Sequence, residues 1–315
     1  MSEEIVVLAG TASRRFGEAV CRCLDQTLAK TDVVRFSDGN IFVKISENVR
    51  GRHVFVIQSV APPVNDNFME LLFWIDAAKR ASASQVTAVI PYFSYAKGDK
   101  KDEPRVSIRA RVCADAIEAA GADRVVTMDL HAPQIQGFFR IPVDDLYALP
   151  VLCEEMCRRK WENITIVSPD VGFAAHAHKF GQQLDAPVAI AAKRRAAHDE
   201  KAEVMELYGT VKGCTAVIVD DFVVSGGTLI EAARKLREMG AAHVMAAVTH
   251  GILPPGSGER IEQSPIEQLL VTDTIEHPDS SALPAKVKVV SVAPLFARAI
   301  ECIRDRASIS TLFPQ

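Results

Sequence analysis

Two acids followed by a glycine-rich turn form the clearest chemical signal in the sequence. The apolar run at 217–219 leads to Asp220 and Asp221, and a Ser-Gly-Gly-Thr turn then opens a helical pattern. A helix N-terminus offers free N–H groups and the positive end of a dipole, and glycines allow close approach, so a phosphate fits this turn. The acids suit sugar hydroxyls or a hydrated Mg²⁺. The phosphate-binding residues are predicted to be Ser225, Gly226, Gly227 and Thr228.

This turn differs from the commonest nucleotide motifs, because the sequence contains neither a Walker A loop nor a GxGxxG fingerprint. It follows an apolar run that is typical of a buried parallel strand, and open α/β sheets bind ligands at the carboxyl ends of such strands. The alternative interpretation is an ordinary capped turn with a pair of acids on the surface.

Other ionisable residues also follow apolar runs. Asp129 and His131 come after the run at 125–128, which suits a carboxylate and an imidazole that face a metal-bound nucleotide. Lys193 and Arg195 follow a second such run. Taken alone, a single histidine is more often a satisfied hydrogen-bonding group, and the two cations more often belong to a solvated basic cluster.

Residues 94–111 carry six bases against three acids, a local charge of 6 − 3 = +3. A basic loop of this kind can close over a polyphosphate and exclude water, although a plain solvated loop is the alternative. The bases are Lys97, Lys100, Lys101, Arg105, Arg109 and Arg111, and the acids are Asp99, Asp102 and Glu103.

Length and composition limit the classes of protein to consider. The 315 residues, 48% of them hydrophobic, indicate an ordinary globular protein of about two domains. With 36 Lys and Arg against 40 Asp and Glu, the net charge of −4 disfavours a nucleic-acid binder. The sequence has no apolar run long enough for a membrane span, and its start is acidic, so we expect a cytoplasmic protein without membrane contact. Seven scattered cysteines without a CxxC pair favour reduced thiols.

Short apolar runs alternate with amphipathic stretches, which predicts mainly parallel sheets covered by helices. One helix is expected after Asn65 as its cap, and another is expected to stop at Gly121. Small antiparallel hairpins are expected over 33–45, with an Asp38-Gly39 turn, and around 204–211, and an irregular link is expected over 140–150. Strands are predicted at 5–9, 54–58, 86–90, 125–128, 164–167, 188–191, 216–219, 244–248 and 269–272, and later helices near 172–184, 228–239 and 294–306.

The acid pair and its turn resemble the ribose 5-phosphate loop of type I phosphoribosyltransferase folds. Segments along the whole chain, in the same order, narrow the resemblance to the ribose-phosphate diphosphokinase family, which makes phosphoribosyl diphosphate (PRPP). These segments are Phe36-Ser37-Asp38-Gly39, Glu47-Asn48-Val49-Arg50-Gly51, Met69-Glu70-Leu71-Leu72, Asp76-Ala77, Lys79-Arg80-Ala81, Pro91-Tyr92-Phe93, Tyr95-Ala96, residues 129–139, Ser168-Pro169-Asp170, Lys193-Arg194-Arg195, Thr249-His250-Gly251 and residues 308–313.

The resemblance implies an α/β fold of two similar type I phosphoribosyltransferase-like domains, each a mainly parallel sheet flanked by helices with a small antiparallel hairpin. Domain 1–147 would be the nucleotide and metal side, and domain 148–315 the ribose 5-phosphate side, with its last residues packed back on the first domain. The implied reaction moves the diphosphate of ATP to the anomeric hydroxyl of ribose 5-phosphate and gives PRPP and AMP. The implied cofactor is Mg²⁺, and the implied assembly is a dimer-based homo-oligomer such as a hexamer.

The resemblance also implies roles for individual residues. Lys193 and Arg195 would be catalytic, as the cations that hold the transferred diphosphate while charge builds up. The ribose 5-phosphate set would be Asp220, Asp221, Ser225, Gly226, Gly227 and Thr228. The nucleotide set would be Phe36, Asp38, Asn40, Lys97, Gly98, Asp99, Lys100 and His131, and the metal set His131, Asp170 and Asp129.

The chain departs from the family pattern at four places, one of which covers two residues. Lys97-Gly98 stands where Arg-Gln is usual, Asn40 replaces a Glu, Phe173 replaces a Gly and Val224 replaces an acid. Lysine keeps a charge but lacks the bidentate fork of arginine. These departures support an alternative hypothesis, in which the chain is a catalytically weak homologue that associates with an active synthase and regulates it. A transferase that consumes PRPP shares the turn but does not explain the match across the first half.

Overall fold

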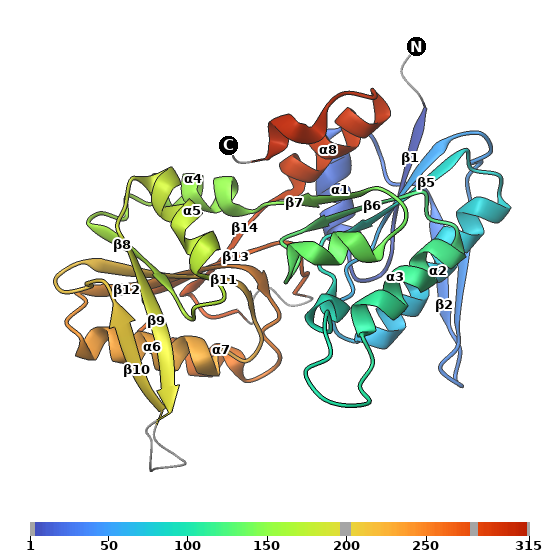
Figure 1. The fold of residues 1–315 in the computed structure, drawn as a ribbon. Helices are drawn as coiled ribbons and strands as arrows, with labels where there is room; N and C mark the ends of the chain where they lie inside the picture. Colours follow the sequence, from blue (N-terminus) through green and yellow to red (C-terminus); the bar gives the residue numbers. More distant parts are fainter. Residues whose placement is uncertain (1–3, 196–202, 278–282, 314–315) are drawn as a thin grey trace. The chain divides into compact units, whose positions relative to one another are not determined.

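The computed structural model describes residues 4–195, 203–277 and 283–313 (Figure 1). Contacts divide the chain into two compact units. The first consists of Met1–Tyr147, Asp273–Glu276 and Ser291–Gln315, and the second of Ala148–Thr272 and His277–Val290. Among the described residues, no helix has both the length and the apolar character that a membrane span requires.

The first unit is built on a sheet of five parallel strands in the order β1-β4-β5-β6-β7 (Figure 1). All residues of β1 and β4 are buried. Such continuous burial requires helices on both faces, as the apolar runs predict. The strands are β1 (Ile5–Ala9), β4 (His53–Ile57), β5 (Gln85–Ile90), β6 (Arg124–Met128) and β7 (Val143–Leu146).

Helices supply the two covering layers of this unit. α2 (Val64–Arg80) and α3 (Arg109–Ala120) share one core cluster with the strands, in which Trp74 is fully buried. α1 (Arg14–Cys23) packs on α8 (Ala293–Arg304), with the rings of Phe16 and Phe296 edge to face at 5.3 Å. Short 3₁₀ turns complete the unit: η1 (Ser94–Lys97), η2 (Pro133–Phe138) and η4 (Ile309–Leu312).

The hairpin predicted over 33–45 is present as β2 (Thr31–Arg35) and β3 (Ile41–Ile45). Gly39 takes the positive φ of 88° that its tight turn needs. Arg35 fastens the hairpin to α2, because its guanidinium lies 2.9 Å from the Asp66 carboxylate and 3.7 Å from the fully buried Glu70. The hairpin tip is therefore held at a fixed place on the unit.

The second unit is built on a seven-stranded sheet in the order β10-β9-β8-β11-β12-β13-β14. Only β10 is antiparallel, and with β9 it forms the second predicted hairpin. The mainly parallel sheets, flanking helices and hairpins confirm the predicted fold class. The strands are β8 (Ile164–Ser168), β9 (Val188–Arg195), β10 (Glu203–Tyr208), β11 (Thr215–Val223), β12 (His243–Gly251), β13 (Gln268–Thr272) and β14 (Val287–Val290), and the helices are α4 (Leu149–Arg158), α5 (Ala174–Leu184), α6 (Gly227–Glu238) and α7 (Ser257–Glu262).

Two local predictions are wrong. Residues 140–150 do not form an irregular link, because they contain β7 and the start of α4, whose first turn accommodates Pro150. Asn65 is not a helix cap, because α2 already begins at Val64, and the Asn65 side chain instead accepts a hydrogen bond from the Tyr95 hydroxyl.

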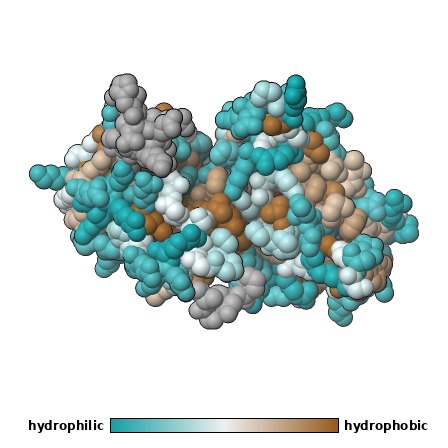
Figure 2. All heavy atoms as spheres, turned by 90° about the horizontal axis from the view of Figure 1, so that it is seen from below, coloured by the Kyte–Doolittle hydropathy of each residue, from teal (hydrophilic) through white to brown (hydrophobic). Residues whose placement is uncertain are grey.

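The surface follows the composition. Hydrophilic side chains cover most of the face drawn in Figure 2, with apolar side chains in smaller patches among them. The exposed large apolar side chains of the described residues include Phe36 and Phe42 of the first hairpin, which are 50% and 48% exposed.

A buried acid lies at the carboxyl end of the first sheet. Asp145 on β7 is 3% exposed, and its carboxylate accepts a hydrogen bond of 3.1 Å from the Leu130 N–H. Burial, with a smaller contribution from the charge of Asp129, raises the pKa of Asp145 from 3.8 to about 8. The folded protein therefore holds a proton here that the unfolded chain releases above about pH 4.

This proton makes the folded state less stable as pH rises. Between the unfolded pKa and the folded pKa the native state binds one more proton than the unfolded state, so the free energy of unfolding falls by about 1.4 kcal/mol per pH unit. Asp145→Asn keeps an acceptor for Leu130 and removes the titration. We expect the stability of the variant relative to the natural protein to increase from pH 5 to pH 7, measured by urea unfolding. Parallel pH profiles for the two proteins would contradict this assignment.

Candidate functional site

The acid pair of the second unit lies on an extension of a central strand, where both residues are half-buried. β11 pairs with β8 only over Thr215–Ile218, whereas its pairing with β12 continues through Asp220 to Val223. Asp220 and Asp221 are thus part of β11 rather than of the loop after it, and they lie beyond the residues that β8 covers. The parallel pairing places them at the carboxyl edge of the sheet, the ligand-binding edge of open α/β sheets.

Electrostatics at this edge favours a cation. Burial raises the pKa of Asp220, and the nearby charges of Asp221 and Asp170 raise it further. The backbone also uses these acids, since Asp221 N–H donates to Asp220 Oδ1 at 3.0 Å and Phe222 N–H to Asp221 Oδ1 at 2.8 Å. Like charges of neighbouring carboxylates repel, and a bound divalent ion would relieve that repulsion.

The predicted phosphate turn ends at the first residues of α6. Gly226 is the N-cap, with a left-handed φ of 80°, a conformation that side chains rarely adopt. Because Gly226 has no side chain, it cannot cap the first turn of α6 itself. A Cβ on Gly227 would have only Ser225 Oγ within 4 Å, at 3.9 Å, and both Gly227 and Thr228 are exposed. The turn therefore presents open N–H groups and hydroxyls to an anion.

Asp170 follows β8 and shapes the start of α5. Its Oδ1 accepts a hydrogen bond of 2.9 Å from Phe173 N–H, and its carbonyl accepts one of 2.6 Å from Ser168 Oγ. The ring of Phe173 stacks on His176, with centroids 4.9 Å apart and planes at 18°. The aromatic side chain that replaces a glycine of the family pattern is thus accommodated by a histidine one turn further along the helix.

His176 of α5 is a residue near this site that the sequence analysis did not single out. Burial and the charge of Lys179 lower its pKa, whereas the charge of Asp221 acts in the opposite direction. α5 follows β8, and β8 pairs with β11, the strand that carries Asp221. The charge of Asp170 thus acts on Asp220, a relation that the sequence analysis did not predict, since the resemblance assigns Asp170 to the metal set with His131 and Asp129.

Lys193 and Arg195 lie near the end of β9, where their backbones pair with Met205 and Glu203 of β10. Their side chains lie outside the part of the chain that the structure describes. The catalytic role predicted for them stays a prediction.

Two predicted segments of the first unit share one sheet edge. Lys97 and Gly98 follow β5, and Asp129 and His131 follow the neighbouring parallel strand β6. Lys97 Nζ lies 5.8 Å from the centroid of the Tyr92 ring, and Asp129 has a positive φ of 43°. His131 and Lys100 are exposed and Asp99 is half-buried, so all three are open to solvent.

The other predicted nucleotide residues lie on the β2–β3 hairpin, which is a separate two-stranded sheet. Phe36 closes the turn, with its N–H donating to the Asn40 carbonyl at 2.9 Å. Asp38 Oδ1 accepts from Asn40 N–H at 3.0 Å, and Asn40 Oδ1 accepts from Ile41 N–H at 2.8 Å. The polar side chains thus shape the turn, while the half-exposed ring of Phe36 offers a stacking surface.

The predicted metal residues belong to different parts of the chain. Asp129 and His131 are in the first unit and Asp170 is in the second. Within the described ranges, no group of three or more His, Cys, Asp or Glu side chains is arranged to hold a metal ion. The metal set stays a prediction.

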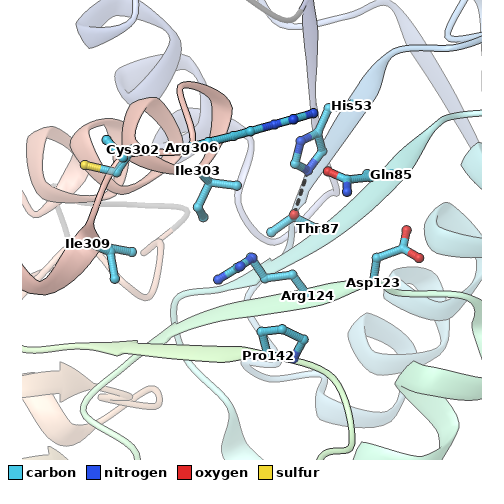
Figure 3. Close-up of a pocket in the computed structure, with 11 residues that line it drawn as sticks. His53, Gln85, Thr87, Asp123, Arg124, Pro142, Cys302, Ile303, Arg306 and Ile309 are labelled. Atoms are coloured by element: carbon cyan, nitrogen blue, oxygen red, sulfur yellow. Dashed lines mark hydrogen bonds between the residues drawn. The ribbon is translucent and has the colours of Figure 1, made fainter.

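A pocket of about 500 Å³ lies at the opposite edge of the first sheet (Figure 3). His53, Gln85 and Arg124, at the starts of three strands, line it together with Cys302 and Ile303 of α8. The ring of His53 is hydrogen-bonded to Thr87 Oγ1 at 2.8 Å. None of the residues that line this pocket belongs to the predicted sites.

Comparisons with known proteins agree along the chain. A profile of the N-terminal domain of ribose phosphate pyrophosphokinase matches residues 5–121, and one of the phosphoribosyl synthetase-associated domain matches residues 182–314. A ribose-phosphate pyrophosphokinase of Ralstonia nicotianae is 46% identical over 315 residues, which cover 100% of this chain and 99% of the relative. Another, of Caldanaerobacter subterraneus, is 47% identical over 313 residues, 99% of this chain and 98% of the relative.

A solved structure extends the agreement to the fold. The crystal structure of phosphoribosylpyrophosphate synthetase from Mycobacterium smegmatis matches with a TM-score of 0.91 at 36% identity, over 97% of this chain and 100% of that one. These similarities confirm the recognised family and favour the synthase over the hypothesis of a weak regulatory homologue. The chain belongs to the ribose-phosphate pyrophosphokinase family.

Proposed function

We propose that this chain transfers the diphosphate of ATP to the anomeric hydroxyl of ribose 5-phosphate, forming PRPP and AMP. The observation that carries the proposal is the acid pair followed by the open turn at the start of α6, in a chain that matches ribose-phosphate pyrophosphokinases over its whole length. Domain 1–147 serves as the nucleotide and metal side and domain 148–315 as the ribose 5-phosphate side. The chain works in the cytoplasm as a dimer-based homo-oligomer.

The ribose 5-phosphate is bound from both ends. The open N–H groups of Gly227 and Thr228, with the hydroxyls of Ser225 and Thr228, hold the 5-phosphate, because a helix N-terminus favours an anion. Asp220 and Asp221 accept hydrogen bonds from the ribose hydroxyls. Both contacts together fix the orientation of the anomeric oxygen, which lowers the entropic part of the barrier.

The nucleotide is bound by the first domain. Phe36 stacks on the base, since its ring is half-exposed at the tip of a firmly anchored hairpin. Asp38 and Asn40 keep the tip in shape. Lys97, Lys100 and the N–H groups around Gly98 and Asp99 contact the polyphosphate, and His131 faces it from the next strand.

Transfer needs little covalent chemistry from the protein. The anomeric oxygen attacks the β-phosphorus and loses its proton, while the bond between that phosphorus and the oxygen retained by AMP breaks. Lys193 and Arg195 hold the moving diphosphate and stabilise the charge that develops on its oxygens. Positioning and electrostatic stabilisation account for catalysis of this type.

A divalent cation fits the donor set of both domains. Asp170 has one carboxylate oxygen free of the Phe173 N–H bond. Burial, together with the charges of Asp221 and Asp170, raises the pKa of Asp220, and a bound cation would act in the opposite direction. Asp170, His131 and Asp129 would hold Mg²⁺. The two carboxylates suit this ion better than the imidazole of His131 does, because Mg²⁺ prefers oxygen ligands. When bound, the ion would neutralise charge on the phosphates.

Phosphorus NMR tests the activity directly. With Mg²⁺, ATP and ribose 5-phosphate, we expect the signals of AMP and PRPP to grow in equal amounts while ATP disappears. Chelation of the metal with EDTA should stop the reaction, and added Mg²⁺ should restore it. If no AMP forms with Mg²⁺ or Mn²⁺ and any common nucleoside triphosphate, the proposal is wrong.

A pair of glycine variants tests the phosphate turn. Gly226 and Gly213 both have positive φ, of 80° and 74°, so an alanine at either place costs about 1–2 kcal/mol of stability. Only Gly226 lies in the turn. We expect Gly226→Ala to raise the KM for ribose 5-phosphate about tenfold and to leave the KM for ATP nearly unchanged, measured by steady-state kinetics.

Gly213→Ala serves as the control, since it carries similar backbone strain in the turn before β11. It should keep both KM values. Equal effects of the two variants on the ribose 5-phosphate KM would show that strain alone, and not the turn, is responsible.

A further inference from the structure

The turn after β5 contains a glycine, Gly98, at a position where the family pattern given with the resemblance has a side chain. Gly98 follows η1 and is buried, and the family pattern has Arg-Gln in place of Lys97-Gly98. Its backbone is fixed on both sides, because Gly98 N–H donates to the Tyr95 carbonyl at 2.9 Å and Ala110 N–H donates to the Gly98 carbonyl at 3.1 Å. The second bond ties the start of α3 to Gly98 and closes the base of the basic loop.

Another side chain fills the space beside Gly98. A Cβ built on Gly98 would lie 2.5 Å from Arg109 Nε, 2.9 Å from Arg109 Cβ and 3.2 Å from Arg109 Cζ. Contacts below 3.0 Å are not tolerated by packed atoms, so no residue larger than glycine fits at 98 while Arg109 keeps its place. The guanidinium of Arg109 thus stands where a side chain at 98 would begin.

Arg109 has no structural task that explains this position. It is the first residue of α3, where a positive charge opposes the helix dipole. Within the described part of the chain it donates no hydrogen bond and forms no ion pair, and its residue is exposed. Its neighbour Arg111 differs, because that guanidinium binds the Asp115 carboxylate at 2.6 and 3.0 Å and the Phe138 carbonyl at 2.6 Å.

The surroundings of Arg109 are those of the proposed nucleotide residues. Burial raises the pKa of the Tyr95 phenol in η1, whereas the positive charge of Arg109 lowers it. Lys97 lies at the end of the same 3₁₀ turn. A guanidinium offers a planar fork of donors that matches two phosphate oxygens, which a lysine ammonium does not.

We infer that Arg109 is a nucleotide-binding residue of this chain, whose guanidinium occupies the space beside Gly98 and binds the phosphates of a nucleoside triphosphate. This inference rests on the proposed function for the identity of the ligand. It explains both residues of the Lys97-Gly98 departure. Glycine at 98 leaves space for the guanidinium of Arg109, and Arg109 supplies the bidentate donor that Lys97 lacks. A guanidinium is thereby present beside Lys97 and Gly98, but it comes from the first residue of α3.

Equilibrium binding tests the inference without requiring turnover. The Kd values for the Mg²⁺ complex of a non-hydrolysable ATP analogue and for ribose 5-phosphate are measured by calorimetry. A charge-assisted bidentate contact contributes enough for Arg109→Ala to weaken analogue binding about tenfold or more. Arg109→Lys should fall between, because it keeps the charge and loses the fork. Ribose 5-phosphate binding should change less than twofold in both variants.

A double-mutant cycle tests the shared space. Gly98→Ala forces Arg109 to move, so it should weaken analogue binding about as much as Arg109→Ala does. The double variant Gly98→Ala with Arg109→Ala should bind no worse than Arg109→Ala alone, since the displaced group is already absent. The remaining Cβ–Cβ contact needs only a small shift of the loop. Additive losses would overturn the idea that the two positions share one function.

Arg80→Gln is the matched control, because it removes one positive charge from an exposed pair with Asp76 on α2. It should leave both Kd values unchanged. The inference is overturned if Arg109→Ala keeps analogue binding within twofold, if it weakens both ligands alike, or if the natural protein binds no analogue. Normal Arg109-dependent binding combined with no AMP formation would instead overturn the proposed reaction and leave this inference standing.

Discussion

Parallel strand pairing is the constraint on which the rest of the structure depends. A parallel sheet has to be covered on both faces, so polar chemistry is excluded from its body and is confined to its edges. β1 and β4 are buried along their whole length, and the central strand β11 is buried from Thr215 to Val219, one residue beyond its pairing with β8. The candidate residues therefore gather at carboxyl edges: Asp129 and His131 after β6, Lys97 after β5, and Asp220 and Asp221 at the free end of β11.

This arrangement brings like charges close together, and the burial of the acids concerned differs between the two units. In the first unit, Asp145 is buried beside Asp129 and holds a proton near neutral pH. In the second, Asp220, Asp221 and Asp170 stay closer to solvent and have the backbone N–H groups of Asp221, Phe222 and Phe173 as donors. The first acid belongs to the frame of the sheet, whereas the second group is suited to a ligand that brings positive charge or hydroxyl donors.

Local patterns predicted most of the fold, and the errors have physical causes. Continuous apolar runs identified nine strands to within a few residues, but β7 and β14 were not predicted. β7 escaped because its four residues include two acids, one of which is buried against expectation. The site was predictable where it depends on consecutive residues, as in the turn at Ser225–Thr228. It was not predictable where segments apart in the sequence meet: the charges of Asp170 and Asp221 both act on Asp220, and Arg109 fills the space beside Gly98, eleven residues before it.

The packing of α1 has a consequence for the order in which the chain can complete its structure during synthesis. Phe16 of α1 packs on Phe296 of α8, and the N–H of Phe16 donates to Glu276 at 2.8 Å. Ser59, at the end of β4, donates its hydroxyl to the Thr274 carbonyl. Glu276 and Thr274 are synthesised 260 and 215 residues after Phe16 and Ser59. One face of α1 therefore stays uncovered while the whole second unit is being synthesised. Exposed apolar surface makes a nascent chain prone to aggregation during this interval.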